Sequence, residues 1–291
     1  MPTIAYHLCD VFADGPLSGN QLAVVEAGEP LPEADLQAVA KEFGFSETTF
    51  LGAPNEDGSV PFRIFTPSVE LRFAGHPTLG SAAVAARDGR RTGIVLECAV
   101  GAIETTLEWI AENAVDVSMV QPNPVISPYQ APDALFAALG IDGSVLPVEL
   151  YDNGMTYVVV GLADEGAVAA LRPDFAALAE LTAVSGVNAG VSCVAGSGCR
   201  FKTRMFAPGF GVAEDPATGS AAGPLACHLA RHGRTRWGED IEIHQGTEIG
   251  RRSILRATAF GSASGIDEVW VAGEVDLLGR GELTWSPVSR P

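Results

Sequence analysis

Two short segments of this 291-residue chain are nearly identical and lie about half a chain length apart. The first reads HPTLGSAA, from His76 to Ala83, and the second reads DPATGSAA, from Asp215 to Ala222; five of the eight positions match. Each segment follows strand-like residues and leads into an Ala-rich stretch typical of a helix. A chance match of short Gly/Ala-rich strings is one explanation. Because the flanking element order also agrees, we infer two structurally similar halves.

Each half therefore places a proline-containing helix start in the same position. The first turn of a helix leaves backbone N–H groups unpaired and carries a partial positive charge. Two such helix starts that face each other across a cleft would bind an anion, and clefts between domains are preferred sites for small molecules. We expect a small anionic substrate with a carboxylate group.

Strand-like runs outnumber helices and do not alternate with them one for one, which predicts an α+β fold. The clearest helices are expected at residues 32–44, 78–88 and 219–232. A segment with four prolines, residues 121–133, is the best domain boundary. We predict an N-terminal domain over residues 1–122, which the C-terminal tail 278–291 can join, and a C-terminal domain over residues 123–277.

The formal net charge of −18 argues against nucleic acid or an anionic membrane as a partner, because both need clustered Lys and Arg. We find no signal peptide and no transmembrane segment, and expect a cytoplasmic protein. The five cysteines include no CxxC pair, so we expect reduced thiols and no zinc site. Cys193 and Cys199 fall on strand-like runs and are expected in the core.

Four side chains are candidates for chemistry. His76 and Asp215 occupy corresponding positions at the two helix starts, where they could orient a substrate amine or hydroxyl or assist proton transfer. Alternatively, His76 is a turn residue and Asp215 is the N-cap of its helix. Glu47 lies in GFSETTFL among apolar residues, which favours a general acid/base, although a surface glutamate has the same pattern. Asn20, at a strand start, binds substrate or holds a turn.

The sequence resembles the PhzF-like proteins of phenazine biosynthesis. The resemblance rests on ELRFAGHPTLGSAA, GFGVAEDPATGSAA, HQGTEIGRRS, CDVFADGPLSGNQLAVV and EFGFSETTFL, and runs from about residue 4 to about residue 275. It implies the diaminopimelate epimerase-like fold, in which two pseudo-symmetric domains each curl a β-sheet around a central helix. It also implies a homodimer, an active site between the domains, and no cofactor or metal.

The resemblance further implies a cofactor-independent isomerase that moves a proton on trans-2,3-dihydro-3-hydroxyanthranilate or an analogue. By motif, Glu47 is the acid/base, assisted by His76 and Asp215. The implied substrate-binding residues are Asn20, Gly75, Gly219 and Ser220. Pro77 stands where the family often has glycine, and it removes one N–H group that could face an anion.

Related epimerases and racemases use a pair of cysteines, one before each central helix. Ala74 and Ala217 occupy those positions here, so a two-cysteine racemase is not expected. Two other functions remain open from the sequence. One is a binding protein that holds an anionic metabolite without turnover. The other is an isomerase or epimerase of an amino-acid-like substrate in secondary metabolism.

Overall fold

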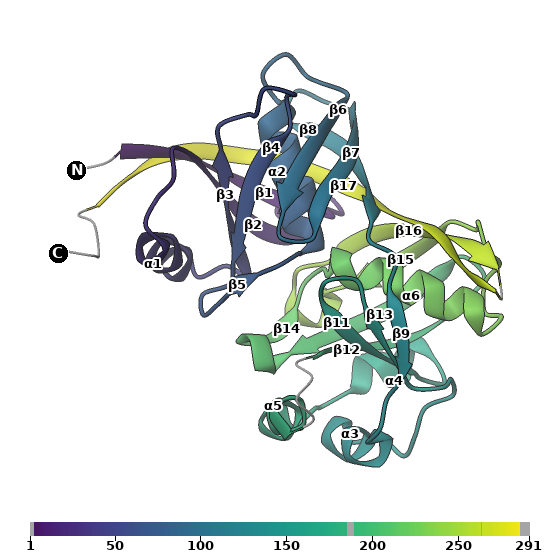
Figure 1. The fold of residues 1–291 in the computed structure, drawn as a ribbon. Helices are drawn as coiled ribbons and strands as arrows, with labels where there is room; N and C mark the ends of the chain where they lie inside the picture. The colour runs from purple at the N-terminus through teal and green to yellow at the C-terminus, as the bar shows by residue number, and fades with distance from the viewer. Residues whose placement is uncertain (1–2, 185–188, 263, 286–291) are drawn as a thin grey trace. The chain divides into compact units, whose positions relative to one another are not determined.

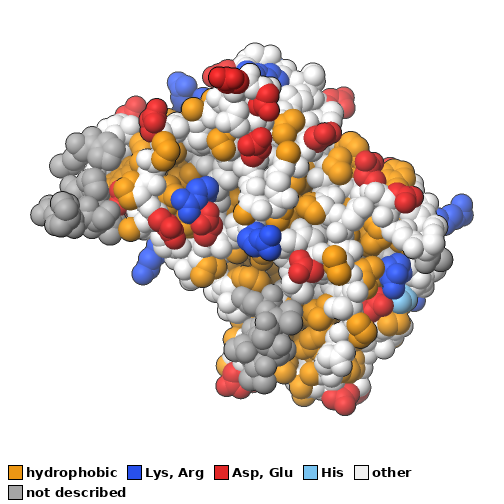
Figure 2. Space-filling model, viewed as in Figure 1, with side chains coloured by type: hydrophobic (Ala, Val, Ile, Leu, Met, Phe, Trp, Pro, Cys, Tyr) orange, Lys and Arg blue, Asp and Glu red, His pale blue; other side chains and the backbone are white. Residues whose placement is uncertain are grey.

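The computed structural model describes residues 3–184, 189–262 and 264–285 (Figure 1). The chain divides into two compact units, one made of residues 1–120 with 272–291 and the other of residues 121–271. The first unit is therefore built from both ends of the chain. No helix in the described ranges is long and apolar enough to cross a membrane. On the face drawn in Figure 2, Lys and Arg side chains lie interspersed among Asp and Glu side chains.

The first unit is a β-sheet with two helices. Its elements are β1 (Thr3–Val11), β2 (Asn20–Gly28), α1 (Glu33–Phe43), β3 (Glu47–Gly52), β4 (Val60–Phe65), β5 (Glu70–Leu71), α2 (Gly75–Ala86), β6 (Gly93–Cys98), β7 (Gly101–Trp109), β8 (Ala114–Gln121) and the end of β17 (Gly265–Thr284). β2 and β3 are parallel across the α1 connection, as are β4 and β6 across α2. β17 pairs with both β1 and β8, so the sheet closes on itself.

Helix α2 lies at the centre of this closed sheet and contacts β1, β2, β3, β6 and β7. Every residue of α2 except Ala85 is buried, as expected for a helix that is apolar on all sides. Gly80 permits the close approach of α2 to the sheet, because a Cβ atom there would lie 2.5 Å from the Leu22 side chain and 3.0 Å from that of Val11. Small residues in α2 thus set the distance between helix and strands.

The second unit repeats this plan. Its elements are β9 (Val125–Pro128), α3 (Pro132–Leu139), β10 (Glu149–Asp152), β11 (Thr156–Gly161), α4 (Glu165–Ala170), α5 (Phe175–Val184), β12 (Ala189–Ser197), β13 (Arg200–Ala207), the 3-10 helix η1 (Pro208–Phe210), β14 (Val212–Asp215), α6 (Gly219–Arg231), β15 (Ile241–Gln245), η2 (Thr247–Ile249), β16 (Ser253–Ser262) and the start of β17. β11 and β12 are parallel across α4 and α5, and β13 and β15 are parallel across α6.

The two units share one order of strand pairings, which confirms the duplication inferred from the repeated segments. The pair β2–β3 corresponds to β11–β12, and the pair β4–β6 corresponds to β13–β15. In each unit the repeated sequence forms the start of the central helix. All of α6 except Arg231 is buried, as is nearly all of α2.

Three local expectations need correction. α2 begins at Gly75 instead of Thr78, so His76 and Pro77 belong to its first turn. Proline fits there because the N–H groups of the first turn have no partner within the helix. The proline-rich boundary contains a short strand, β9. Cys193 is buried as expected, but Cys199 is exposed. It lies in the two-residue turn between β12 and β13, and its predicted place in the core was wrong.

Candidate active site

The residues proposed for chemistry and binding fall into two sets, one in each unit. Asn20, Glu47, Gly75 and His76 belong to the first unit, and Asp215, Gly219 and Ser220 belong to the second. Each set is gathered around the start of a central helix, α2 or α6.

In the first unit, two parallel strands and one helix start bring three side chains together. Asn20 is the first residue of β2 and Glu47 the first residue of β3, so both lie at the same edge of the sheet. His76 occupies the first turn of α2. Its Nε2 atom lies 3.5 Å from Oε2 of Glu47. Its Nδ1 atom lies 3.2 Å from Nδ2 of Asn20.

Asn20 and the backbone of Gln21 both contact the His76 ring. Ser46 donates its hydroxyl hydrogen to Oδ1 of Asn20 at 3.0 Å. The NH2 group of Asn20 therefore faces Nδ1 of His76. The backbone of Gln21 also hydrogen-bonds the His76 ring, a contact that favours the protonated imidazole. Ser46 was not singled out from the sequence, although it lies in the same GFSETTFL segment as Glu47.

His76 is neutral in the folded protein. The residue is only 2% exposed, and burial lowers its pKa from 6.5 to about 3. Its Nε2 atom makes no hydrogen bond within the described part of the chain. A buried polar atom without a partner is costly in a folded protein, and such atoms occur where a ligand completes the site. The position is more consistent with ligand contact than with a simple turn residue.

Glu47 occupies a partly enclosed position at the start of β3. Its side chain is 13% exposed, so the alternative of a surface glutamate does not describe it. The neighbouring strand residues Thr48 and Thr49 are fully buried. The side chain thus keeps a small exposed fraction at one edge of the sheet, while its Oε2 atom and its surroundings are buried.

In the second unit, Asp215 is the last residue of β14 and is 4% exposed. Its Oδ2 atom accepts a hydrogen bond of 2.5 Å from the Thr218 hydroxyl. The N-cap of α6 is Thr218 itself, which excludes the alternative in which Asp215 is the N-cap. Gln245 holds this loop, because its Nε2 atom donates to the Asp215 carbonyl at 2.8 Å and to the Thr218 hydroxyl at 3.0 Å.

Three further side chains fix the first turn of α6. The hydroxyl groups of Tyr157 and Ser220 lie 2.5 Å apart. Asn153 donates to the Ser220 carbonyl at 2.9 Å, and Gln121 donates to the Gly219 carbonyl at 2.8 Å. Sequence reasoning missed these supporting residues. Of the supporting residues, only Gln245 could have been found from the sequence, since it belongs to the family-like segment HQGTEIGRRS.

Neither central helix has a side-chain cap at its start. The N-cap of α2 is Ala74, and neither it nor Thr218 caps its helix with a side-chain hydrogen bond. No acidic residue lies in the first turn of α2 or α6. Backbone N–H groups at such ends suit an anionic ligand. Ala74 and Ala217 are both buried and have no ionisable group, so neither can transfer a proton.

Comparison with known proteins shows the family to which the chain belongs. A model of the phenazine biosynthesis-like protein family, PhzC-PhzF, matches residues 9–278. The chain belongs to this family. The PhzF chain is 43% identical over 278 residues to the trans-2,3-dihydro-3-hydroxyanthranilate isomerase of Pseudomonas fluorescens, an alignment that covers 96% of this chain and 98% of that protein.

Solved structures give the same result for the fold of this PhzF chain. A predicted epimerase from Pseudomonas aeruginosa matches it with a TM-score of 0.84 at 31% identity, over 97% of this chain and 100% of that one. A hydroxyproline epimerase from Agrobacterium vitis matches with a TM-score of 0.64 at 12% identity, over 97% and 92% of the two chains, and supports the fold alone. The PhzF chain is thus an isomerase with the diaminopimelate epimerase-like fold, as predicted.

Proposed function

We propose that the protein isomerises trans-2,3-dihydro-3-hydroxyanthranilate or a close analogue by moving a proton between carbon atoms. The observation that carries this proposal is the pair formed by Glu47 and His76, whose Oε2 and Nε2 atoms are 3.5 Å apart at the start of α2. We infer the substrate from that of a relative that is 43% identical over nearly the whole chain.

Glu47 is the single acid/base in this proposal. Its carboxylate removes a proton from a substrate carbon activated by neighbouring unsaturated groups and returns it to another carbon, so that the product has the same composition as the substrate. Proton transfer by a placed side chain contributes about 10²–10⁴-fold to the rate. The neutral His76 contacts the substrate beside Glu47, because its buried Nε2 atom lies 3.5 Å from the carboxylate and has no hydrogen-bond partner in the described part of the chain.

The second unit contributes binding groups. Asp215 orients the amino group of the substrate, and Ser220 binds its carboxylate together with the N–H groups near Gly75 and Gly219. Asn20 acts through His76, whose ring it holds. No step requires a cofactor. The homodimer implied by the family resemblance belongs to the same proposal, and light scattering is expected to give about twice the 30.2 kDa mass of the chain.

The amino-acid-like substrate has less support. Epimerisation by a pair of thiols needs a cysteine before each central helix, and Ala74 and Ala217 stand there. A one-base reaction through Glu47 remains available for either substrate. A comparison of turnover with dihydro-hydroxyanthranilate and with a series of α-amino acids separates the two.

The test is isomerisation in D₂O, followed by NMR and mass spectrometry. Wild type is expected to form product that contains carbon-bound deuterium, because the proton held on the Glu47 carboxyl group can exchange with solvent before it is returned. Glu47→Gln should lose activity by at least about 10²-fold, while Glu42→Gln, an exposed glutamate on α1, should retain it. Equal turnover by Glu47→Gln and wild type would rule out the proposed base. Absence of turnover in wild type would rule out the proposed substrate.

A further inference from the structure

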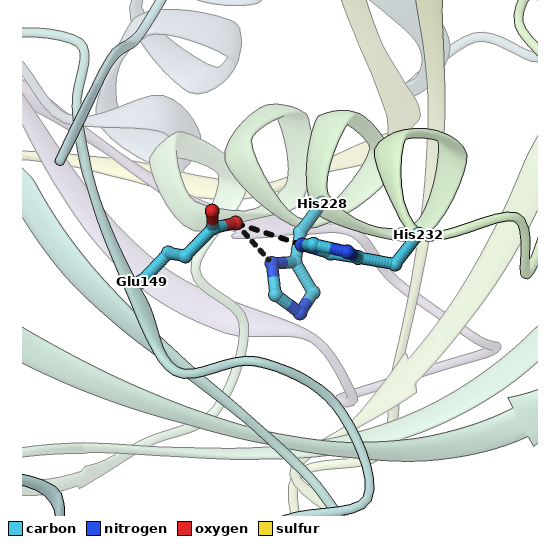
Figure 3. Close-up of side chains that lie close together, drawn as sticks. All are labelled: Glu149, His228 and His232. Carbon is cyan, nitrogen blue, oxygen red and sulfur yellow. Dashed lines mark hydrogen bonds and ion pairs between the residues drawn. The ribbon is translucent and has the colours of Figure 1, made fainter. Parts of the chain in front are cut away.

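A cluster of metal-ligating side chains lies at the other end of α6, away from its first turn (Figure 3). It consists of Glu149 at the start of β10 and of His228 and His232 on the last turns of α6 and its C-cap. The Nδ1 atom of His228 lies 3.5 Å and the Nε2 atom of His232 lies 2.8 Å from Oε2 of Glu149. One ligand atom from each residue falls within 4.8 Å of the others.

The sequence builds this cluster from an H-x-x-x-H spacing and one neighbouring strand. Residues four apart on a helix lie on the same face, so His228 and His232 project together toward β10. The His228 side chain is fully buried, whereas those of His232 and Glu149 are 20% and 18% exposed. The cluster is therefore anchored on its inner side and open to solvent on its outer side, which provides a path for an ion.

Two imidazoles and a carboxylate are a donor set that suits zinc and similar divalent transition metals. Bonds of about 2.0–2.2 Å in a tetrahedral site separate neighbouring ligand atoms by about 3.3–3.5 Å. The separation of 3.5 Å between His228 and Glu149 already fits. The separation of 2.8 Å between His232 and Glu149 must open by roughly half an ångström, which the partly exposed His232 side chain allows.

Two neighbouring side chains, Arg231 and Tyr151, contact the Glu149 carboxylate. Arg231 approaches the other carboxylate oxygen, Oε1 of Glu149, at 3.5 Å, so Oε2 is the atom directed at the histidines. The Tyr151 hydroxyl lies 2.9 Å from Oε2 of Glu149 and 3.1 Å from Nδ1 of His228. It can supply a fourth ligand or orient a bound water. The C-terminal end of a helix also favours a cation.

We propose that Glu149, His228 and His232 form a binding site for zinc or a similar divalent transition metal. The ion fastens the C-terminal end of α6 to β10 and has no part in the proton transfer assigned to Glu47. The proposal departs from the expectation of no zinc site, which rested on the absence of paired cysteines. The H-x-x-x-H spacing alone did not indicate where a third ligand would come from, because Glu149 lies far away in sequence.

The test uses the full chain after removal of metal with a chelator. Isothermal titration with zinc is expected to show one equivalent bound, and zinc should raise the thermal midpoint of unfolding. Cobalt should give visible absorption bands typical of a site with nitrogen and oxygen ligands. His232→Gln keeps a hydrogen-bond donor near Glu149 but removes the imidazole nitrogen that would bind the metal. It should weaken zinc binding by at least about tenfold. Glu149→Gln should do the same.

Two control variants separate this cluster from adventitious binding. His244→Gln removes a histidine that pairs with Glu242 elsewhere in the unit, and Cys199→Ser removes an exposed thiol. Both should bind zinc as wild type does. The proposal is overturned if wild type binds no zinc, or if His232→Gln and Glu149→Gln, with native circular dichroism, bind it unchanged. Loss of binding in a control variant assigns the metal to another residue and likewise overturns it.

Discussion

Asn20 and His76 lie 56 positions apart in the sequence, and the amide nitrogen of Asn20 is 3.2 Å from Nδ1 of His76. The contact holds the ring in a position where Nε2 lies 3.5 Å from the Glu47 carboxylate. A side chain that we first interpreted as a substrate ligand thus also orients its neighbour. The consequences for catalysis and for stability can be measured separately.

Replacement of Asn20 by Ala should lower kcat by roughly tenfold to a hundredfold, because the His76 ring loses the contact that orients it beside Glu47. The effect on KM should be smaller if Asn20 acts only through His76. Steady-state kinetics provides the measurement. Asn55→Ala is the matched control, since Asn55 bonds to Ser59 on an exposed loop of the same unit. A rise in KM with unchanged kcat would instead assign Asn20 to substrate binding.

The stability of the protein should depend on pH through His76. Burial lowers its pKa in the folded state to about 3, whereas the unfolded state has a pKa near 6.5. Between these values the unfolded state binds the extra proton, so the free energy of unfolding falls as pH decreases, by up to about 1.4 kcal/mol per pH unit. Urea unfolding at pH 7, 6 and 5 measures the slope.

The variant His76→Asn lacks this ionisation and should show a shallower slope than wild type over the same pH range. The comparison of slopes removes the contribution of other titrating groups, which both proteins share. Parallel slopes for the two proteins would mean that His76 is not buried in its neutral form.

Substitution of Gly80 by Ala should destabilise the first unit by about 1–3 kcal/mol through overpacking. The added methyl group would lie 2.5 Å from the Leu22 side chain, between α2 and the sheet. Chemical denaturation gives the change in free energy of unfolding. Gly143→Ala is the control, because a Cβ atom at that position meets no neighbour within 4 Å. Equal stability of the two variants would show that α2 moves to accommodate the methyl group.

Loss of the Gln245 side chain in Gln245→Ala should reduce both activity and stability. Its amide holds the Asp215 carbonyl and the Thr218 hydroxyl, and a buried partner left without its hydrogen bond costs about 1–3 kcal/mol. Thermal unfolding and kcat/KM should decrease together. Gln130→Ala, an exposed glutamine on the same unit, should change neither. If the Gln245→Ala protein is destabilised but keeps a normal kcat/KM, the position of the Asp215–Thr218 loop does not contribute to the reaction.

The repeated segment and the strand patterns were sufficient to predict two similar units with a helix start in the same position of each, and the family resemblance implied that each helix is central. They were less informative about where α2 begins, because Gly75, His76 and Pro77 resemble a turn when they are considered without their tertiary contacts. Cys199 illustrates a related limit: its flanking residues are strand-like, but a two-residue turn at Gly198 and Cys199 reverses the chain.

The site itself was predictable only as a set of residues. Motif resemblance singled out Glu47 and His76, but their approach depends on β2, β3 and α2 meeting at one edge of a sheet. Supporting contacts such as Tyr157 with Ser220 come from strands whose sequences carry ordinary core residues. Long-range pairing of this kind leaves little trace in a single sequence, because each partner satisfies its local pattern without the other.

The strand that closes the first unit has a consequence for biosynthesis. β1 and β8 both pair with β17, and the β17 residues that pair with β1 run from Val275 to Thr284. During translation these residues are made after the other strands of the first unit, so until they emerge the N-terminal sheet is open and has two unprotected edges. The second unit, whose strands are nearly all made earlier, can fold first. We expect C-terminal truncation before residue 272 to give a nascent product that is captured by chaperones.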